Sequence, residues 1–175
     1  MAAGTVVIGV GNPLCGDDAA GRAVIRSLKA AGVPTGVELV ESDGDPATLI
    51  ELWQGRGVAV VVDAVRSGVA PGSVHHLELP GMAAVPPGTS SHGLGLAEAV
   101  GIAAAVGRLP RRLVVFGIEA GGCEPGTDLS APVARAAEAL AEEIRRAMEP
   151  ELVNTLGERH RFVSLSRPMP TTPLS

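Results

Sequence analysis

The sequence predicts an α/β protein in which a mainly parallel, twisted sheet lies between two layers of helices. Apolar segments of strand length alternate along the chain with amphipathic segments of helix length. One of the expected strands, residues 57–65, is apolar on both faces, as is typical of the centre of a parallel sheet. Together these two observations predict a three-layer α/β/α arrangement with helices flanking the sheet.

The individual elements follow from periodicity and from helix start and stop signals. In the first helix, Ala20, Val24 and Leu28 recur every four residues, and Gly32 ends it. Asp45-Pro46 begins the second helix and Ser130 the last one, because a side-chain acceptor and an early proline favour a helix start. The expected strands cover residues 6–10, 37–41, 57–65, 73–79 and 113–118, the fourth being an edge strand. The expected helices cover residues 18–31, 45–53, about 90–106 and 130–148.

The chain of 175 residues is expected to form one domain, because that length can bury about 70% of the surface of the unfolded chain. We place this domain at residues 1–149. Residues 150–175 lose the periodic pattern and gather prolines and hydroxyl side chains, so they are expected to form a loosely ordered tail.

Composition excludes several classes of partner. The formal net charge of −5 argues against nucleic-acid binding, which needs a basic face to neutralise phosphates. The longest apolar run, near residues 58–62, is far too short to cross a bilayer, and no basic leader precedes the first strand. We therefore expect a soluble cytoplasmic protein with neither a nucleic-acid nor a membrane partner.

The two cysteines give no disulfide framework and no C-x-x-C motif. Cys15 is the only candidate nucleophile, but the sequence supplies no obvious base paired with it. A nucleophilic role for Cys15 is accordingly disfavoured.

The first strand leads into a glycine turn that carries acids. Gly9 and Gly11 begin a G-x-G-x-x-G pattern, but Leu14 stands where its third glycine would fall. Asp17 and Asp18 at the mouth of the following helix would repel a pyrophosphate. The turn therefore favours oxygen ligands or a general base over a nucleotide cradle, and a nucleotide-binding domain is disfavoured.

Three residues stand where α/β proteins build sites. Asp18 follows the first strand, Asp63 lies at the end of the central strand, and His92 lies at the N-terminus of the third expected helix. Their sequence separations are 63 − 18 = 45 and 92 − 63 = 29, so only convergence of the carboxyl ends of parallel strands would bring them together. Two carboxylates and an imidazole suit a divalent ion such as nickel or zinc.

Each candidate also has a structural interpretation. Asp17 and Asp18 are both placed to cap a helix, and His92 alone is more often an ordinary loop histidine. Asp63 is harder to explain structurally, because a carboxylate ending an apolar strand is costly to desolvate without a partner. His75 and His76 are expected to be solvated on an edge strand, and Asp43 is expected to be a turn acid in a loop near the same edge of the sheet.

These segments resemble the [NiFe]-hydrogenase maturation endopeptidases. The matching motifs are Gly9–Gly21 (GVGNPLCGDDAAG), Val61–Ala64 (VVDA), Ser91–Leu94 (SHGL), and Phe116–Glu119 (FGIE) with Leu129–Pro132 (LSAP). The resemblance covers about residues 5–148. The second acid of the first motif is often Glu in that family and is Asp18 here, and Ala19-Ala20 stands where the family often has Gly.

The resemblance implies a peptide hydrolase that clips a C-terminal extension from the precursor of the hydrogenase large subunit after nickel insertion. The family's nickel-contacting positions map onto Asp18, Asp63 and His92. Nickel would be presented by the substrate and would not reside in the enzyme. Two alternatives remain: a metallohydrolase that keeps its own zinc at these residues, and a non-catalytic, nickel-sensing chaperone of the large subunit.

Overall fold

The fold is given by a computed structural model, which describes residues 4–80 and 93–149. The strands are β1 (Thr5–Val10), β2 (Val37–Ser42), β3 (Val58–Val65), β4 (Val74–Pro80) and β5 (Arg112–Glu119). The helices are the 3-10 turn η1 (Gly16–Ala19), α1 (Ala20–Ala31), α2 (Pro46–Trp53), α3 (Gly93–Ala105) and α4 (Ala131–Ala147). The predicted tail, residues 150–175, lies outside the described residues, as do residues 81–92.

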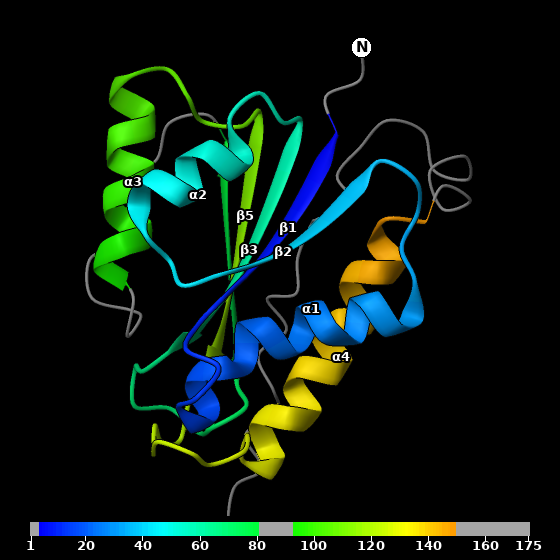
Figure 1. Ribbon diagram of the computed structural model, residues 1–175, viewed down its shortest axis with the longest axis vertical. Coiled ribbons are helices and arrows are strands. Elements are labelled where there is room, and N and C mark those ends of the chain that lie inside the picture. The colour runs from blue at the N-terminus through cyan, green and yellow to red at the C-terminus, as the bar shows by residue number, and fades with distance from the viewer. Residues whose placement is uncertain (1–3, 81–92, 150–175) are drawn as a thin grey trace, which may run out of the picture.

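The five strands form one sheet in the order β2-β1-β3-β5-β4, with β4 antiparallel to β5 and all other neighbours parallel. Helices α1 and α4 cover one face, and α2 and α3 cover the other (Figure 1). The predicted α/β/α class is thus confirmed. Strand β3 lies at the centre of the sheet and is buried from Ala59 to Val65, as its doubly apolar sequence predicted.

The core consists almost entirely of aliphatic side chains, one cluster on each face of the sheet. The α1–α4 face packs Val60 and Val62 of β3 against the two helices, and the opposite face packs Ala59 and Val61 against α2 and α3. This alternation assigns Asp63, two residues after Val61, to the face that α3 covers.

Glycines let the start of α1 approach the sheet closely. A Cβ on Gly9 would lie 2.2 Å from the carbonyl oxygen of Gly21, and one on Gly21 would lie 2.2 Å from that of Val62. Both approaches are far inside van der Waals contact, so only glycine fits at either position. The first motif therefore docks η1 and α1 against β1 and β3, which fixes where Asp18 lies relative to β3.

The helix ends agree with the predictions except at the first helix. Asp45 caps α2 by accepting a hydrogen bond from the Thr48 N–H at 3.0 Å, and the Gly32 N–H closes α1 on the Leu28 carbonyl at 2.9 Å. The first helix was predicted from Asp18, but residues 16–19 form a 3-10 turn and the α-helix begins at Ala20. The prediction that Asp17 or Asp18 caps it is wrong, because neither η1 nor α1 receives a side-chain cap.

Candidate functional site

Among the described residues, four acidic side chains are buried at the carboxyl edge of the parallel strands. Asp17 is 3% exposed and Asp18 5%, while Asp63 and Glu119 are each 1% exposed. Asp17 and Asp18 lie in η1 after β1, Asp63 lies near the end of β3, and Glu119 ends β5. Because β1, β3 and β5 are parallel and adjacent, one edge of the sheet gathers all four acids.

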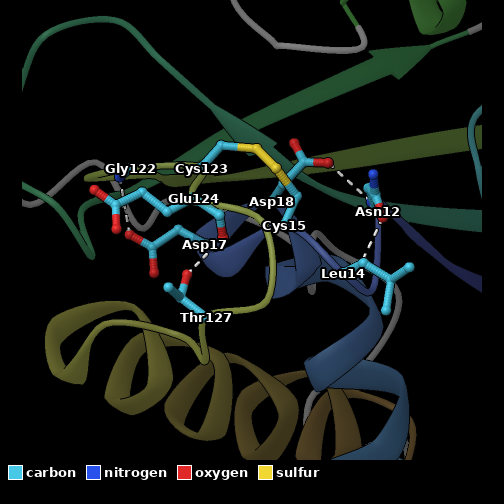
Figure 2. The surroundings of a disulfide bond; sticks show 9 residues. All are labelled: Asn12, Leu14, Cys15, Asp17, Asp18, Gly122, Cys123, Glu124 and Thr127. Carbon is cyan, nitrogen blue, oxygen red and sulfur yellow. Dashed lines mark hydrogen bonds between the residues drawn. A yellow bond between two sulfur atoms is a disulfide. The ribbon is translucent and has the colours of Figure 1, made fainter.

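Asp18 is held by the turn in which it lies. Its Oδ2 accepts a hydrogen bond from the backbone N–H of Asn12 at 2.8 Å, and its own N–H donates to the carbonyl of Cys15 at 3.0 Å. Figure 2 shows its carboxylate directed toward Asn12. Two backbone groups of the turn, the Asn12 N–H and the Cys15 carbonyl, therefore help to set the position of Asp18.

Asp63 lies in the centre of the sheet edge. Its Oδ1 accepts a hydrogen bond from the N–H of Ala64 at 2.8 Å, and the register places it opposite Gly117 of β5. The 3-10 turn η1 packs against β3, which brings the segment carrying Asp18 to the strand carrying Asp63. The convergence of these two segments, expected from the order of the strands, is present.

His92 lies outside the described residues, so its place relative to the two carboxylates stays a prediction. The helix that follows it in the chain, α3, starts at this edge. A Cβ on Gly95, in the first turn of α3, would lie 2.6 Å from the carbonyl oxygen of Gly44, which lies in the loop after β2. The first turn of α3 therefore packs against a loop at the carboxyl edge, on the face of the sheet assigned to Asp63.

Asp17 joins distant loops and does not cap its own helix. Its Oδ1 accepts from the N–H of Ser130 at 2.6 Å, and its Oδ2 accepts from the Ser130 hydroxyl at 2.9 Å and from the N–H of Gly121 at 2.8 Å and Gly122 at 3.3 Å. As predicted, Ser130 is the N-cap residue of α4. Its hydroxyl donates to Asp17, however, and makes no capping hydrogen bond with the helix. Asp17 therefore fastens η1 to the loop before α4.

Glu119 holds the loop that follows β3. Its carboxylate accepts hydrogen bonds from the N–H and hydroxyl of Ser67, at 2.7 and 2.8 Å, and from the N–H of Gly68 at 2.9 Å. The ring of His75 lies 3.0 Å away through Nε2. Burial alone would raise the pKa of Glu119, but the hydrogen bonds from Ser67, Gly68 and His75 outweigh it and lower the pKa below its usual value.

Sequence reasoning did not single out Glu119 as a site residue, although a signal was present. Like Asp63, Glu119 lies toward the carboxyl end of a strand and directly after an apolar run, here residues 113–118, so the same desolvation argument applies to it. His75 was predicted to be solvated; its side chain is 44% exposed but also contacts Glu119. The same prediction is wrong for His76, whose ring stacks on Phe116 with centroids 4.8 Å apart, because the antiparallel register sets the two residues opposite each other.

The two cysteines form a disulfide between Cys15 and Cys123, with Cα atoms 4.9 Å apart (Figure 2). No local pattern predicts this bond, because 108 residues separate the two positions. The disulfide forms where the glycine turn meets the loop after β5, and an isolated antiparallel β-bridge pairs the backbones of Cys15 and Pro125 at the same place. In this state Cys15 carries no free thiol, so the nucleophile that the sequence allowed is absent.

The described residues do not hold a complete metal site by themselves. Within residues 4–80 and 93–149, no group of three His, Cys, Asp or Glu side chains is arranged to hold a metal ion. A set of three ligands that includes Asp18 and Asp63 thus requires His92 or groups from another molecule. Carboxylate oxygens at such an edge can bind a divalent cation jointly with donors of that kind, or activate a water molecule.

Fold and site together define a three-layer α/β protein with buried carboxylates at the carboxyl edge of its sheet. The profile of the family described as "HycI: Hydrogenase maturation protease" matches residues 23–147, well over half of the chain. The chain therefore belongs to the hydrogenase maturation protease family, and it is a peptide hydrolase of hydrogenase maturation.

Individual relatives agree with this assignment. The hydrogenase expression/formation protein HupM of Azotobacter chroococcum is 30% identical over 86% of this chain and 69% of its own length. The hydrogenase 2 maturation protease of Escherichia coli is 28% identical over 82% of this chain and 89% of its own. The solved structure of the hydrogenase maturating endopeptidase HybD from E. coli matches with a TM-score of 0.69 and 26% identity, covering 82% of this chain and 91% of that one.

No helix among the described residues is long and apolar enough to cross a membrane.

Proposed function

We propose that this endopeptidase removes the C-terminal extension of a [NiFe]-hydrogenase large-subunit precursor after nickel insertion, and that it recognises the nickel carried by that substrate. Asp18, Asp63 and His92 would contact the metal. The supporting observation is the burial of two carboxylates, Asp18 and Asp63, on neighbouring segments at the carboxyl edge, in a member of this family. The placement of the first turn of α3 beside Gly44 favours the inclusion of His92.

The residues fit a borderline divalent ion such as nickel, because carboxylate and imidazole are both suitable donors. When bound, nickel fixes the substrate relative to the enzyme. The reaction is hydrolysis of one peptide bond: water adds to the carbonyl carbon, the C–N bond breaks, and the released amine takes a proton. A carboxylate at this edge serves as the general base, and the fixed position of the substrate supplies proximity.

The test is a cleavage assay on the large-subunit precursor from the same source, with and without nickel loaded, followed by intact mass. We expect loss of a C-terminal peptide from the nickel-loaded precursor alone. Cleavage regardless of nickel would contradict recognition through the metal.

The two alternatives predict different results in the same experiment. Stable binding of the precursor without a change in mass would favour the nickel-sensing chaperone. A zinc ion that copurifies at about one per chain, and whose removal stops cleavage, would favour the metallohydrolase with a resident metal.

A further inference from the structure

The disulfide joins the loop that carries the candidate site to a loop more than a hundred residues away. Cys15 lies in the glycine turn between β1 and η1, and Cys123 lies in the loop between β5 and α4 (Figure 2). These are the only two cysteines of the chain. Both residues are partly exposed, so a thiol in solution can reach the bond.

Cys15 is linked to Asp18 through backbone hydrogen bonds. The Cys15 carbonyl accepts from the Asp18 N–H at 3.0 Å, and the Cys15 N–H donates to the Asn12 carbonyl at 3.3 Å. Asn12 in turn donates its N–H to the Asp18 carboxylate at 2.8 Å. Cys15, Asn12 and Asp18 thus form a closed set of contacts, so a shift of Cys15 changes the position of the Asp18 carboxylate.

Other contacts between the two loops do not involve sulfur. The Asp17 carboxylate accepts hydrogen bonds from Gly121, Gly122 and Ser130, and none of these bonds passes through Cys15 or Cys123. Fewer contacts hold the tip of the turn. The Gly126 N–H donates a hydrogen bond to the Leu14 carbonyl at 2.8 Å, and an isolated β-bridge joins Cys15 to Pro125. Cleavage of the disulfide should therefore loosen residues 12–15, and with them the Asn12 N–H that holds the Asp18 carboxylate, while Asp17 keeps η1 attached.

We propose that the Cys15–Cys123 disulfide is a thiol-sensitive bond that positions Asp18, so that the protease is active when the bond is intact and slow when it is reduced. The proposal rests on the role proposed for Asp18. The reductant is a dithiol: its thiolate attacks one sulfur, the other leaves as a thiolate and is protonated, and the second thiol of the reductant displaces the first cysteine. Two electrons and two protons reach the protein, and the dithiol becomes a disulfide.

The experiment compares the full-length protein before and after treatment with dithiothreitol, with free thiols counted by alkylation and intact mass. On nickel-loaded precursor, we expect reduction to lower kcat roughly tenfold to a hundredfold with little change in KM, because a small misplacement of a site residue acts on the reacting geometry. Removal of the reductant and reoxidation restores the rate. Equal kcat for both forms would overturn the proposal.

The double variant Cys15→Ser/Cys123→Ser is the control for effects of the thiol on the precursor itself. It should cleave at the slow rate both with and without dithiothreitol. A double variant as fast as the oxidised wild type would overturn the proposal. Loss of the wild type's far-UV circular dichroism signal on reduction would also overturn it, because the disulfide would then support the whole fold.

A second measurement keeps this proposal separate from the proposed function. We expect reduction of the wild type to shift the amide NMR signals of Asn12 and Asp18 and to leave those of α2 in place. If the oxidised protein does not cleave the precursor, the proposed function fails while this measurement still decides the positioning effect. Unshifted Asn12 and Asp18 signals would overturn it.

Discussion

Asp17 and Asp18 are adjacent in the sequence and both buried, yet Asp17 is bound by a distant loop and Asp18 is bound by the turn just before it. Asp17 accepts four hydrogen bonds from the loop before α4, more than a hundred residues away. Asp18 accepts a hydrogen bond from Asn12, in its own turn. The contrast recurs on the neighbouring strands, where Glu119 binds Ser67 and Gly68 of a distant loop and Asp63 accepts from the next residue, Ala64.

This comparison separates two uses of a buried carboxylate. Asp17 and Glu119 each bind a segment that is far away in the sequence, so we assign them a structural role. Asp18 and Asp63 lie at the same edge, and we propose that they contact the substrate's nickel. The two pairs should therefore respond differently to substitution: one pair should change stability and the other activity.

The largest effect is expected at Asp63. In Asp63→Asn, the amide binds a metal more weakly and cannot take up a proton, so processing should fall at least about 100-fold. The measurement is the rate of cleavage of the nickel-loaded precursor by intact mass, together with circular dichroism to verify the fold. The matched control is Asp43→Asn, an exposed acid in the loop after β2, which should cleave normally. Normal cleavage by Asp63→Asn would remove this residue from the site.

A smaller effect, on stability, is expected at Asp17. Asp17→Ala leaves the N–H groups of Ser130 and Gly121 without their acceptor, which should lower the free energy of unfolding by about 1–3 kcal/mol. Urea unfolding measures it. Asp17→Asn keeps one amide oxygen as an acceptor and should lose less. If Asp17→Ala had the same urea midpoint of unfolding as the wild type, the proposal that Asp17 fastens η1 to the loop before α4 would be wrong.

The smallest effect is expected at Glu119 and depends on pH. Its pKa is lowered in the folded protein, so its ionised form adds stability above the usual pKa of 4.5, and this contribution is lost as the pH falls through the folded value. Glu119→Gln removes that dependence, so its unfolding free energy should decline less steeply than the wild type's below about pH 4.5. Urea unfolding of both proteins at about five pH values between pH 3 and 7 would give the dependence of the unfolding free energy on pH. Parallel curves for the two proteins would show that Glu119 does not contribute in this way.

Much of the fold was predictable because its signals are local. The apolar run of β3, the four-residue period of α1 and the start of α2 at Asp45-Pro46 each depend on residues close together in the chain. The 3-10 turn at residues 16–19 was missed because the close approach of Gly9 and Gly21, which sets the entry to α1, is a tertiary contact.

The candidate site was predictable in part. Asp18 and Asp63 were chosen as candidates from their places after β1 and near the end of β3, since parallel strands bring such positions to one edge. Both are buried at that edge, and their role in the reaction stays a prediction. The role of Asp17 was not predictable, because its partners Gly121, Gly122 and Ser130 become neighbours only when η1 packs beside the loop after β5. The stacking of His76 on Phe116 likewise depends on the register of β4 against β5.

By itself, the sequence determined the α/β class, most of the helices and strands, and the family to which the chain belongs, because periodicity, glycine positions and short motifs are written along the chain. The tertiary structure decided which buried acids tie loops together, and it decided that Cys15 meets Cys123. Those outcomes depend on distances between segments about a hundred residues apart, and only the packing of helices on the sheet sets such distances.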